Sequence, residues 1–207
     1  MNKKVSILIF ILGFVAINIF SQENNGQNWF QKHFNQRIYL GLGVSFGDEK
    51  ATVLHFGYDA VLNLIDITPT WHLLDFSLGM DILMVRDQIE KETPDNFGHI
   101  RHTDNRLIPG FEFNWGVRLY SPPFPKIDTC LYFEAAPISL VLYTQPYPDT
   151  GTRFNVGTHV GFGFKFPVND LLKGYTTIRV FSHTSNGQPE ETNPALDYTS
   201  IILGLQF

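Results

Sequence analysis

The chain has 207 residues, a length suited to one domain, and it is 43% hydrophobic, 14% aromatic and only 17% charged. Its net charge of -5 leaves no basic surface for nucleic acid, and no nucleotide-binding loop motif is present. A mean hydropathy of -0.05 argues against a helical membrane protein, whereas 19 phenylalanines suit a barrel whose rings face lipid and both membrane interfaces. The single cysteine, Cys130, excludes an internal disulfide.

Residues 1–21 are typical of a secretory signal peptide. Two lysines precede an apolar run from Val5 to Phe20, and Ser21 supplies a small residue where cleavage is expected. The alternative is an uncleaved membrane anchor, although the run is near the short end for spanning a bilayer. We expect residues 22–36, which are polar and rich in amides, to form a periplasmic lead-in before a barrel at residues 37–207.

From residue 37 onward, apolar side chains alternate with small or polar ones, which is the pattern of strands with one face toward lipid. In the clearest row, from Phe111 to Leu119, Glu112 and Arg118 fall on the opposite face and are expected to pair across a narrow lumen. The predicted strands cover 37–46, 52–60, 76–84, 111–119, 129–143, 154–166, 175–185 and 197–207. The sequence therefore predicts an all-β fold, an eight-stranded antiparallel transmembrane β-barrel with its outer loops after the first, third, fifth and seventh strands.

Three local features refine this barrel. Residues 86–106 are strongly charged and show no alternation, so we expect a long extracellular loop there. Pro137 falls within the fifth strand and requires a bulge or bend, because proline donates no backbone hydrogen bond. The last strand ends at Phe207 with apolar residues at alternate positions, an ending of the kind that barrel-insertion machinery reads. The predicted location is the bacterial outer membrane.

The candidate chemistry lies on the last two predicted strands. His183 and Ser185 are two residues apart, so their side chains share a face and the imidazole can take the hydroxyl proton. If these strands form a hairpin, Asp197 enters at the same end and can orient the imidazole. Arg179 has the same parity, however, and an arginine facing lipid at mid-membrane costs about 2–4 kcal/mol. Three alternatives stay open: a bulge between Arg179 and His183, a snorkelling arginine, or a row that faces the lumen and so removes the catalytic site.

A family resemblance rests on this same region. The run His183-Thr184-Ser185-Asn186, the following Asn193-Pro194, the acid Asp197 and the aromatic C-terminus together resemble the outer-membrane lipid A 3-O-deacylases of the PagL type, a family of acyloxyacyl hydrolases. The resemblance implies an eight-stranded barrel that removes an ester-linked acyl chain from lipid A with a Ser-His-acid triad on its outer wall. It also implies that lipid A or lipopolysaccharide is the substrate and that outer-membrane lipids surround the protein.

The predicted mechanism is that of a carboxylic ester hydrolase. Ser185 attacks the ester carbonyl, His183 acts first as base and then as acid, and Asp197 holds the imidazole in one tautomer. The loop between the last two strands contains two rival acids, Glu190 and Glu191. No metal ion or other cofactor is required by this mechanism.

Asn186 and the backbone N–H of Gly187 are candidates for the oxyanion hole, because fixed donors must face the charge that develops on the carbonyl oxygen. One alternative enzyme is an outer-membrane phospholipase A, which resembles this pattern but uses a larger barrel and calcium. The non-enzymatic alternative is a small structural or adhesive barrel, which the charged stretch at residues 86–106 favours.

Overall fold

The computed structural model describes residues 33–46, 50–68, 71–95, 98–147, 152–185 and 195–207, and side chains are not described at 71–72 and 89–104. One compact unit contains Asn35–Phe207, and the other, Met1–Phe34, lies almost entirely outside the described residues. The strands are β1 (Phe34–Ser45), β2 (Lys50–Thr68), β3 (Trp71–Asp95), β4 (Gly98–Tyr120), β5 (Cys130–Tyr143), β6 (Phe154–Pro167), β7 (Lys173–Ser185) and β8 (Leu196–Gln206). No helix in these ranges has the length and apolar character needed to cross a membrane.

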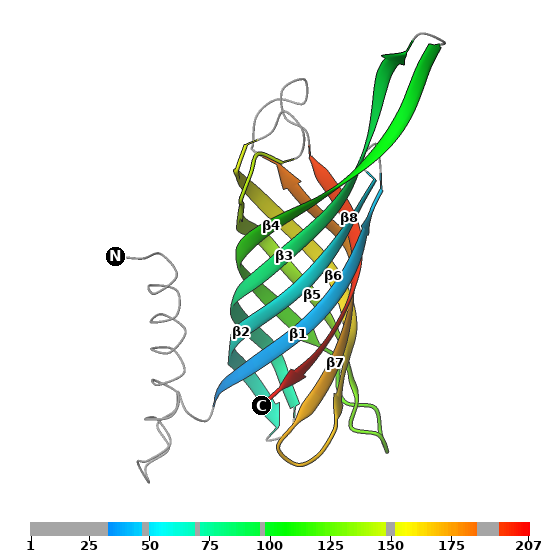
Figure 1. The fold of residues 1–207 in the computed structure, drawn as a ribbon. Coiled ribbons are helices and arrows are strands. Elements are labelled where there is room, and N and C mark those ends of the chain that lie inside the picture. The colour runs from blue at the N-terminus through cyan, green and yellow to red at the C-terminus, as the bar shows by residue number, and fades with distance from the viewer. Residues whose placement is uncertain (1–32, 47–49, 69–70, 96–97, 148–151, 186–194) are drawn as a thin grey trace. The chain divides into compact units, whose positions relative to one another are not determined.

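The described strands form a closed antiparallel barrel in which each strand pairs with its neighbours in sequence (Figure 1). β1 closes the barrel against β8, with a register that runs from Arg37 opposite Gln206 to Ser45 opposite Tyr198. The eight-stranded antiparallel barrel predicted from the sequence is thereby confirmed. The C-terminal ends of β1, β3, β5 and β7 lie at one end of the barrel, which we call the outer rim.

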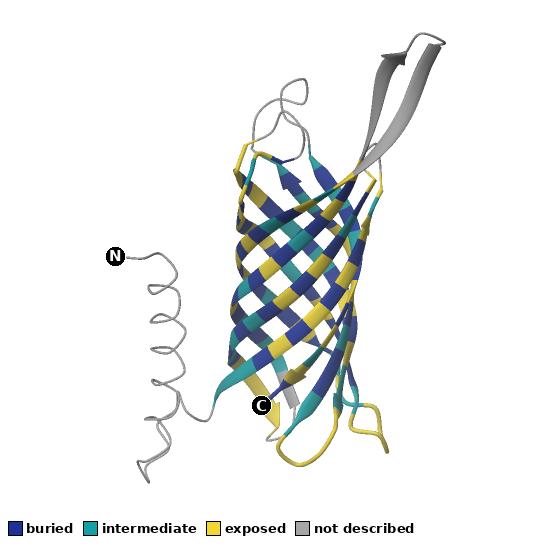
Figure 2. Ribbon diagram, viewed as in Figure 1, coloured by how far each residue is buried: buried dark blue, intermediate teal, exposed yellow. Residues whose placement is uncertain are grey.

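The alternation in the sequence becomes the two faces of the wall. Along β4, Phe113 is 52% exposed, whereas its neighbours Glu112 and Asn114 are buried. The same alternation of exposed and buried residues covers the barrel wall (Figure 2). An apolar outer face and a polar inner face are the arrangement that lipid requires of a closed barrel.

The lumen holds two clusters of buried apolar and aromatic side chains together with a network of buried ion pairs. Arg118 donates two hydrogen bonds to Glu134, at 2.7 and 2.5 Å, and Arg179 donates a third to the same carboxylate at 3.0 Å. His159 Nε2 lies 3.8 Å from Glu134. The predicted pairing of Arg118 with Glu112 is therefore wrong, because Glu134 lies directly opposite Arg118 on the adjacent strand β5 and reaches it without crossing the lumen.

The charged stretch at residues 86–106 is not a loop, contrary to the prediction. β3 continues to Asp95 and β4 begins at Gly98, and their pairing extends from Arg86 opposite Leu107 to Asp95 opposite Gly98. This two-stranded ribbon continues past the outer rim (Figure 1). Backbone hydrogen bonds hold such a ribbon without an apolar face, so its sequence shows no alternation.

Pro137 produces the bulge that was predicted in the fifth strand. The register of β5 against β6 shifts between Ala136 and Ser139, and the adjacent residues Pro137 and Ile138 are both exposed. One extra residue therefore lies on the outer wall, where a missing backbone donor is accommodated.

Candidate functional site

β7 contains a bulge that decides which of its side chains face outward. Arg179 is buried in the lumen, Val180 and Phe181 are both exposed, and Ser182 is buried again. The register against β6 shifts at this point, because Val160 pairs with Phe181 and Gly161 with Arg179, which leaves Val180 as the extra residue. Of the three alternatives that the sequence left open, the bulge is the one found. It keeps Arg179 inside and turns the odd-numbered residues beyond it outward.

Beyond the bulge, His183 of β7 lies directly opposite Asp197 of β8. His183 Nδ1 is 2.7 Å from Asp197 Oδ1, and the two side chains are 33% and 35% exposed. Directly opposed residues on one face of a sheet are within reach of a side-chain hydrogen bond. The backbone of Asp197 is also fixed, because Phe46 N donates to its carbonyl oxygen at 3.0 Å. This histidine–carboxylate pair lies on the outer wall near the rim.

Ser185 is the last residue of β7 and lies on the same face as His183. It pairs across the sheet with Val156 of β6 and is half-buried. The strand spacing puts its Cα about 7 Å from that of His183. The structure thus puts Ser185 on the outward face that also carries the His183–Asp197 pair.

The other predicted site residues follow Ser185 in the connection to β8. The oxyanion candidates Asn186 and Gly187 and the rival acids Glu190 and Glu191 all lie outside the described residues. Their proximity to His183 therefore stays a prediction.

Two aromatic rings that the sequence analysis did not assign to the site support the histidine. The ring of Phe181 stacks on that of His183, with centroids 5.9 Å apart and an angle of 9° between the planes. Phe46, which directly follows β1, contacts Phe181 with ring centroids 6.4 Å apart. The sequence shows that Phe181 and His183 share a face, because they are two residues apart. That this face is the outer one depends on the bulge. The contact with Phe46 depended on barrel closure.

The hydrogen bond to Asp197 has a chemical consequence for the imidazole. The Asp197 carboxylate accepts a hydrogen bond from Nδ1–H, so the neutral ring carries its lone pair on Nε2. Such a ring is a base with a defined direction, as general acid–base catalysis requires. The assignment of Nδ1 as donor follows from this partner.

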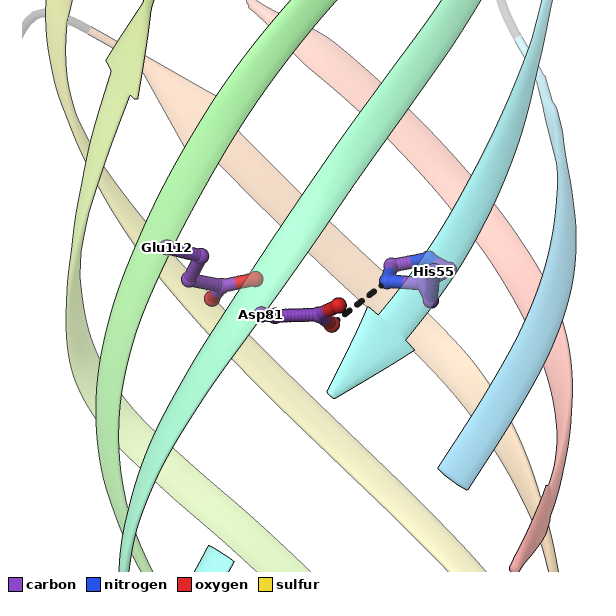
Figure 3. A group of neighbouring side chains, drawn as sticks. All are labelled: His55, Asp81 and Glu112. Atoms are coloured by element: carbon purple, nitrogen blue, oxygen red, sulfur yellow. Dashed lines mark hydrogen bonds and ion pairs between the residues drawn. The ribbon is translucent and has the colours of Figure 1, made fainter. Parts of the chain in front are cut away.

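A second group of acid–base side chains lies inside the barrel. His55, Asp81 and Glu112 are buried and bring one ligand atom each to within 4.8 Å of the others, close enough to share a metal ion (Figure 3). The sequence analysis put Glu112 on the inward face but did not bring these three residues together. It missed the group because their proximity depends on the pairing of three strands.

Comparisons with known proteins bear on both the fold and the family. The crystal structure of the outer membrane enzyme PagL matches with a TM-score of 0.56 at 13% identity, over 81% of this chain and 97% of that chain. The crystal structure of Neisserial surface protein A (NspA) matches with a TM-score of 0.50 at 11% identity, over 84% of this chain and 94% of that chain. At these identities the two structures show the barrel fold alone. No curated protein sequence matches the chain.

The family is shown by the sequence itself. A profile described as Lipid A 3-O-deacylase (PagL) matches residues 98–206, which is more than half of the chain and includes His183, Ser185 and Asp197. Together with the barrel and its apolar outer wall, this match places the protein in the outer membrane. The chain belongs to the lipid A 3-O-deacylase (PagL) family.

Proposed function

We propose that this protein is an outer-membrane esterase that removes an ester-linked acyl chain from lipid A with a triad of Ser185, His183 and Asp197. The observation that carries the proposal is the 2.7 Å contact between His183 Nδ1 and Asp197 Oδ1 on the outer wall, with Ser185 on the same face. A lumen-facing pair would be shielded from lipid. This pair instead lies where an acyl chain of the membrane can reach it.

The reaction follows from the roles that the geometry supports. Ser185 Oγ attacks the ester carbonyl while His183 Nε2 takes the hydroxyl proton, and the carbonyl π electrons move to the oxygen. The tetrahedral intermediate then expels the sugar oxygen, which receives the proton from His183. Water next attacks the acyl-enzyme with His183 as base, releases the fatty acid and restores Ser185. Asp197 holds the imidazole in position through both steps.

The oxyanion hole is assigned to the residues that follow the nucleophile. The side-chain amide of Asn186 and the backbone N–H of Gly187 come directly after Ser185 in the sequence. Fixed donors at this place would face the carbonyl oxygen as it gains negative charge, an effect that commonly supplies about 3–4 kcal/mol of transition-state stabilisation.

The site's position suits a substrate that never leaves the membrane. His183 and Ser185 lie near the outer rim, and lipid A occupies the outer leaflet in the predicted orientation. Exposed Phe181 and Phe46 beside the pair give an acyl chain an apolar surface to pack on. The enzyme therefore acts on a bilayer component from the side of the barrel.

The segments before the barrel belong to export in this proposal. Residues 1–21 act as the signal peptide and residues 22–36 as a periplasmic lead-in, although β1 begins at Phe34, within that lead-in. Barrel-insertion machinery recognises the C-terminal segment formed by β8 and Phe207.

Incubating the purified barrel in detergent with lipid A and with phospholipid, each with calcium or with EDTA, tests the proposal. We expect fatty acid to be released from lipid A in both conditions and phospholipid to stay intact, because side chains and backbone donors fill every catalytic role. His183→Ala should lose the release while keeping heat-modifiable gel migration. Calcium-dependent phospholipid hydrolysis would favour a phospholipase, and hydrolysis of neither lipid would favour a non-enzymatic barrel.

A further inference from the structure

The group of His55, Asp81 and Glu112 is built by three adjacent strands in the lumen (Figure 3). Asp81 of β3 lies directly opposite Glu112 of β4, and on its other side it lies opposite Gly57 of β2. His55 is two residues from Gly57 on the same inward face. Diagonal neighbours of this kind are within reach of long or aromatic side chains.

The three side chains are shielded from solvent and oriented toward one another. His55, Asp81 and Glu112 are 0%, 1% and 3% exposed. His55 Nδ1 lies 2.8 Å from Asp81 Oδ2, and the carboxylate of Glu112 points toward Asp81 (Figure 3). Two ligands of a tetrahedral ion lie about 3.3 Å apart, so the hydrogen bond between His55 and Asp81, at 2.8 Å, would lengthen only slightly to admit a shared metal.

Each of the three residues also buries a polar atom that has no hydrogen-bond partner. These atoms are His55 Nε2, Asp81 Oδ1 and Glu112 Oε2. A buried donor or acceptor without a partner costs about 1–3 kcal/mol, and more when the group is charged. Unpartnered polar atoms also occur elsewhere in the lumen, as at both carboxylate oxygens of Asp75, but here they coincide with one imidazole and two carboxylates at metal-ligand spacing.

The positively charged side chains nearby do not neutralise the two carboxylates of the group. Among the described residues, six carboxylates and three guanidinium groups are buried in the barrel. Arg37 forms an ion pair with Asp59, and Arg118 and Arg179 both pair with the single carboxylate of Glu134. Asp87 is paired with the part-exposed Arg106. With His55 neutral, as a metal ligand must be, the spare positive charge of Arg179 offsets only one of the carboxylates Asp81 and Glu112. Tyr39 adds only a hydroxyl group, 3.4 Å from Asp81 Oδ2.

We propose that His55, Asp81 and Glu112 bind a divalent transition-metal ion, with zinc the best fit, inside the barrel. One imidazole nitrogen and two carboxylate oxygens are ligands that zinc accepts, with a fourth position left for water. Calcium and magnesium prefer sites made only of oxygen atoms, so the imidazole disfavours them. The ion would neutralise the excess carboxylate charge.

This site is structural and distinct from the catalytic one. Its ligands come from β2, β3 and β4 and face the lumen, whereas His183 and Asp197 face outward from β7 and β8. The ring of His55 packs against Tyr198 of β8, with centroids 5.6 Å apart. The ion therefore joins β2, β3 and β4 and stabilises the wall next to β8.

Refolding in the presence of zinc tests the proposal, because the ligands are buried once the barrel has closed. The full mature barrel is refolded with zinc, desalted into metal-free buffer and analysed for metal content. We expect about one zinc ion per chain in the wild type, and an unfolding midpoint higher than that of protein refolded with EDTA. Refolding with cobalt should give visible absorption bands typical of nitrogen and oxygen ligands.

Conservative variants identify the ligands. His55→Gln, Asp81→Asn and Glu112→Gln should each lose the ion and the zinc-dependent rise in midpoint. His159→Gln and Asp75→Asn, which alter other buried lumen residues, should keep the ion, as should His183→Ala on the outer wall. A wild type that retains no zinc overturns the proposal even if a variant fails to fold. Zinc that is lost in His183→Ala but kept in His55→Gln overturns it as well.

Discussion

The contact between His183 and Asp197 gives a single imidazole on the barrel's outer wall a defined direction and tautomer. Parity within one strand was enough to predict that His183 and Ser185 share a face. The pairing of His183 with Asp197 required the register of β7 against β8, which a long polar connection leaves undetermined in the sequence. The support from Phe46 was not predictable, because it comes from the opposite end of the chain.

The first prediction concerns Asp197. Asp197→Ala should lower turnover, but by about 10²-fold less than Ser185→Ala, because an orienting acid contributes less than the nucleophile. Stability should change little, since the side chain is 35% exposed. The measurement is the rate of fatty-acid release from lipid A by equal amounts of each folded barrel.

The rival acids provide the control for this prediction. Glu190→Ala and Glu191→Ala should retain activity if these residues only solvate the connection before β8. An inactive Glu191→Ala beside a fully active Asp197→Ala would assign the acid's role to the loop and contradict the role given to Asp197.

At the scale of a strand, the bulge in β7 lets Arg179 and His183 face opposite sides of the wall, although regular alternation would put both on one face. Arg179 needs the lumen, where Glu134 accepts its hydrogen bond at 3.0 Å, and His183 needs the outer wall. The sequence showed the conflict but not its solution, because Val180 is an ordinary strand residue with no turn or bulge signature. By contrast, the bulge at Pro137 was predictable, since proline itself cannot complete the ladder.

The second prediction is that deletion of Val180 abolishes activity. Without the extra residue, either His183 and Ser185 turn into the lumen, or Arg179 turns toward lipid at a cost of about 2–4 kcal/mol. Deacylation and the urea midpoint in lipid vesicles measure the two effects. Ser185→Ala serves as the folded but inactive reference. A deletion variant that is as active and as stable as the wild type would show that the bulge does not determine which side of the wall His183 and Ser185 face.

At the scale of the whole barrel, the outer wall is the feature that the sequence predicted most completely. Exposed residues such as Phe113 and Phe162 lie at the predicted alternate positions. The interior was less predictable, because the partner of Arg118 depends on which strand lies beside it. The ribbon at residues 86–106 was missed for a related reason: strand pairing beyond the membrane leaves no apolar pattern to detect.

The third prediction uses two apolar residues in different surroundings. Phe162→Lys, within β6 and opposite Ile178 of β7, should destabilise the inserted barrel by about 2–4 kcal/mol, because it puts a charge on the lipid-facing wall. Leu171→Lys, in the connection between β6 and β7, should destabilise the barrel by only about 0–1 kcal/mol, because the cost of a charge falls with distance from the middle of the bilayer. Urea unfolding in vesicles measures both free energies. Equal costs would contradict a lipid-facing outer wall.

The most direct test of the catalytic account compares two serines of β7 that face opposite ways. Ser185 lies on the outer face with His183, whereas Ser182 is buried in the lumen. Each is changed to alanine in a host whose lipid A acylation is known, and lipid A is analysed by mass at matched outer-membrane abundance. The account predicts that Ser182→Ala removes one acyl chain as the wild type does and that Ser185→Ala leaves lipid A intact. Full deacylation by Ser185→Ala would contradict it.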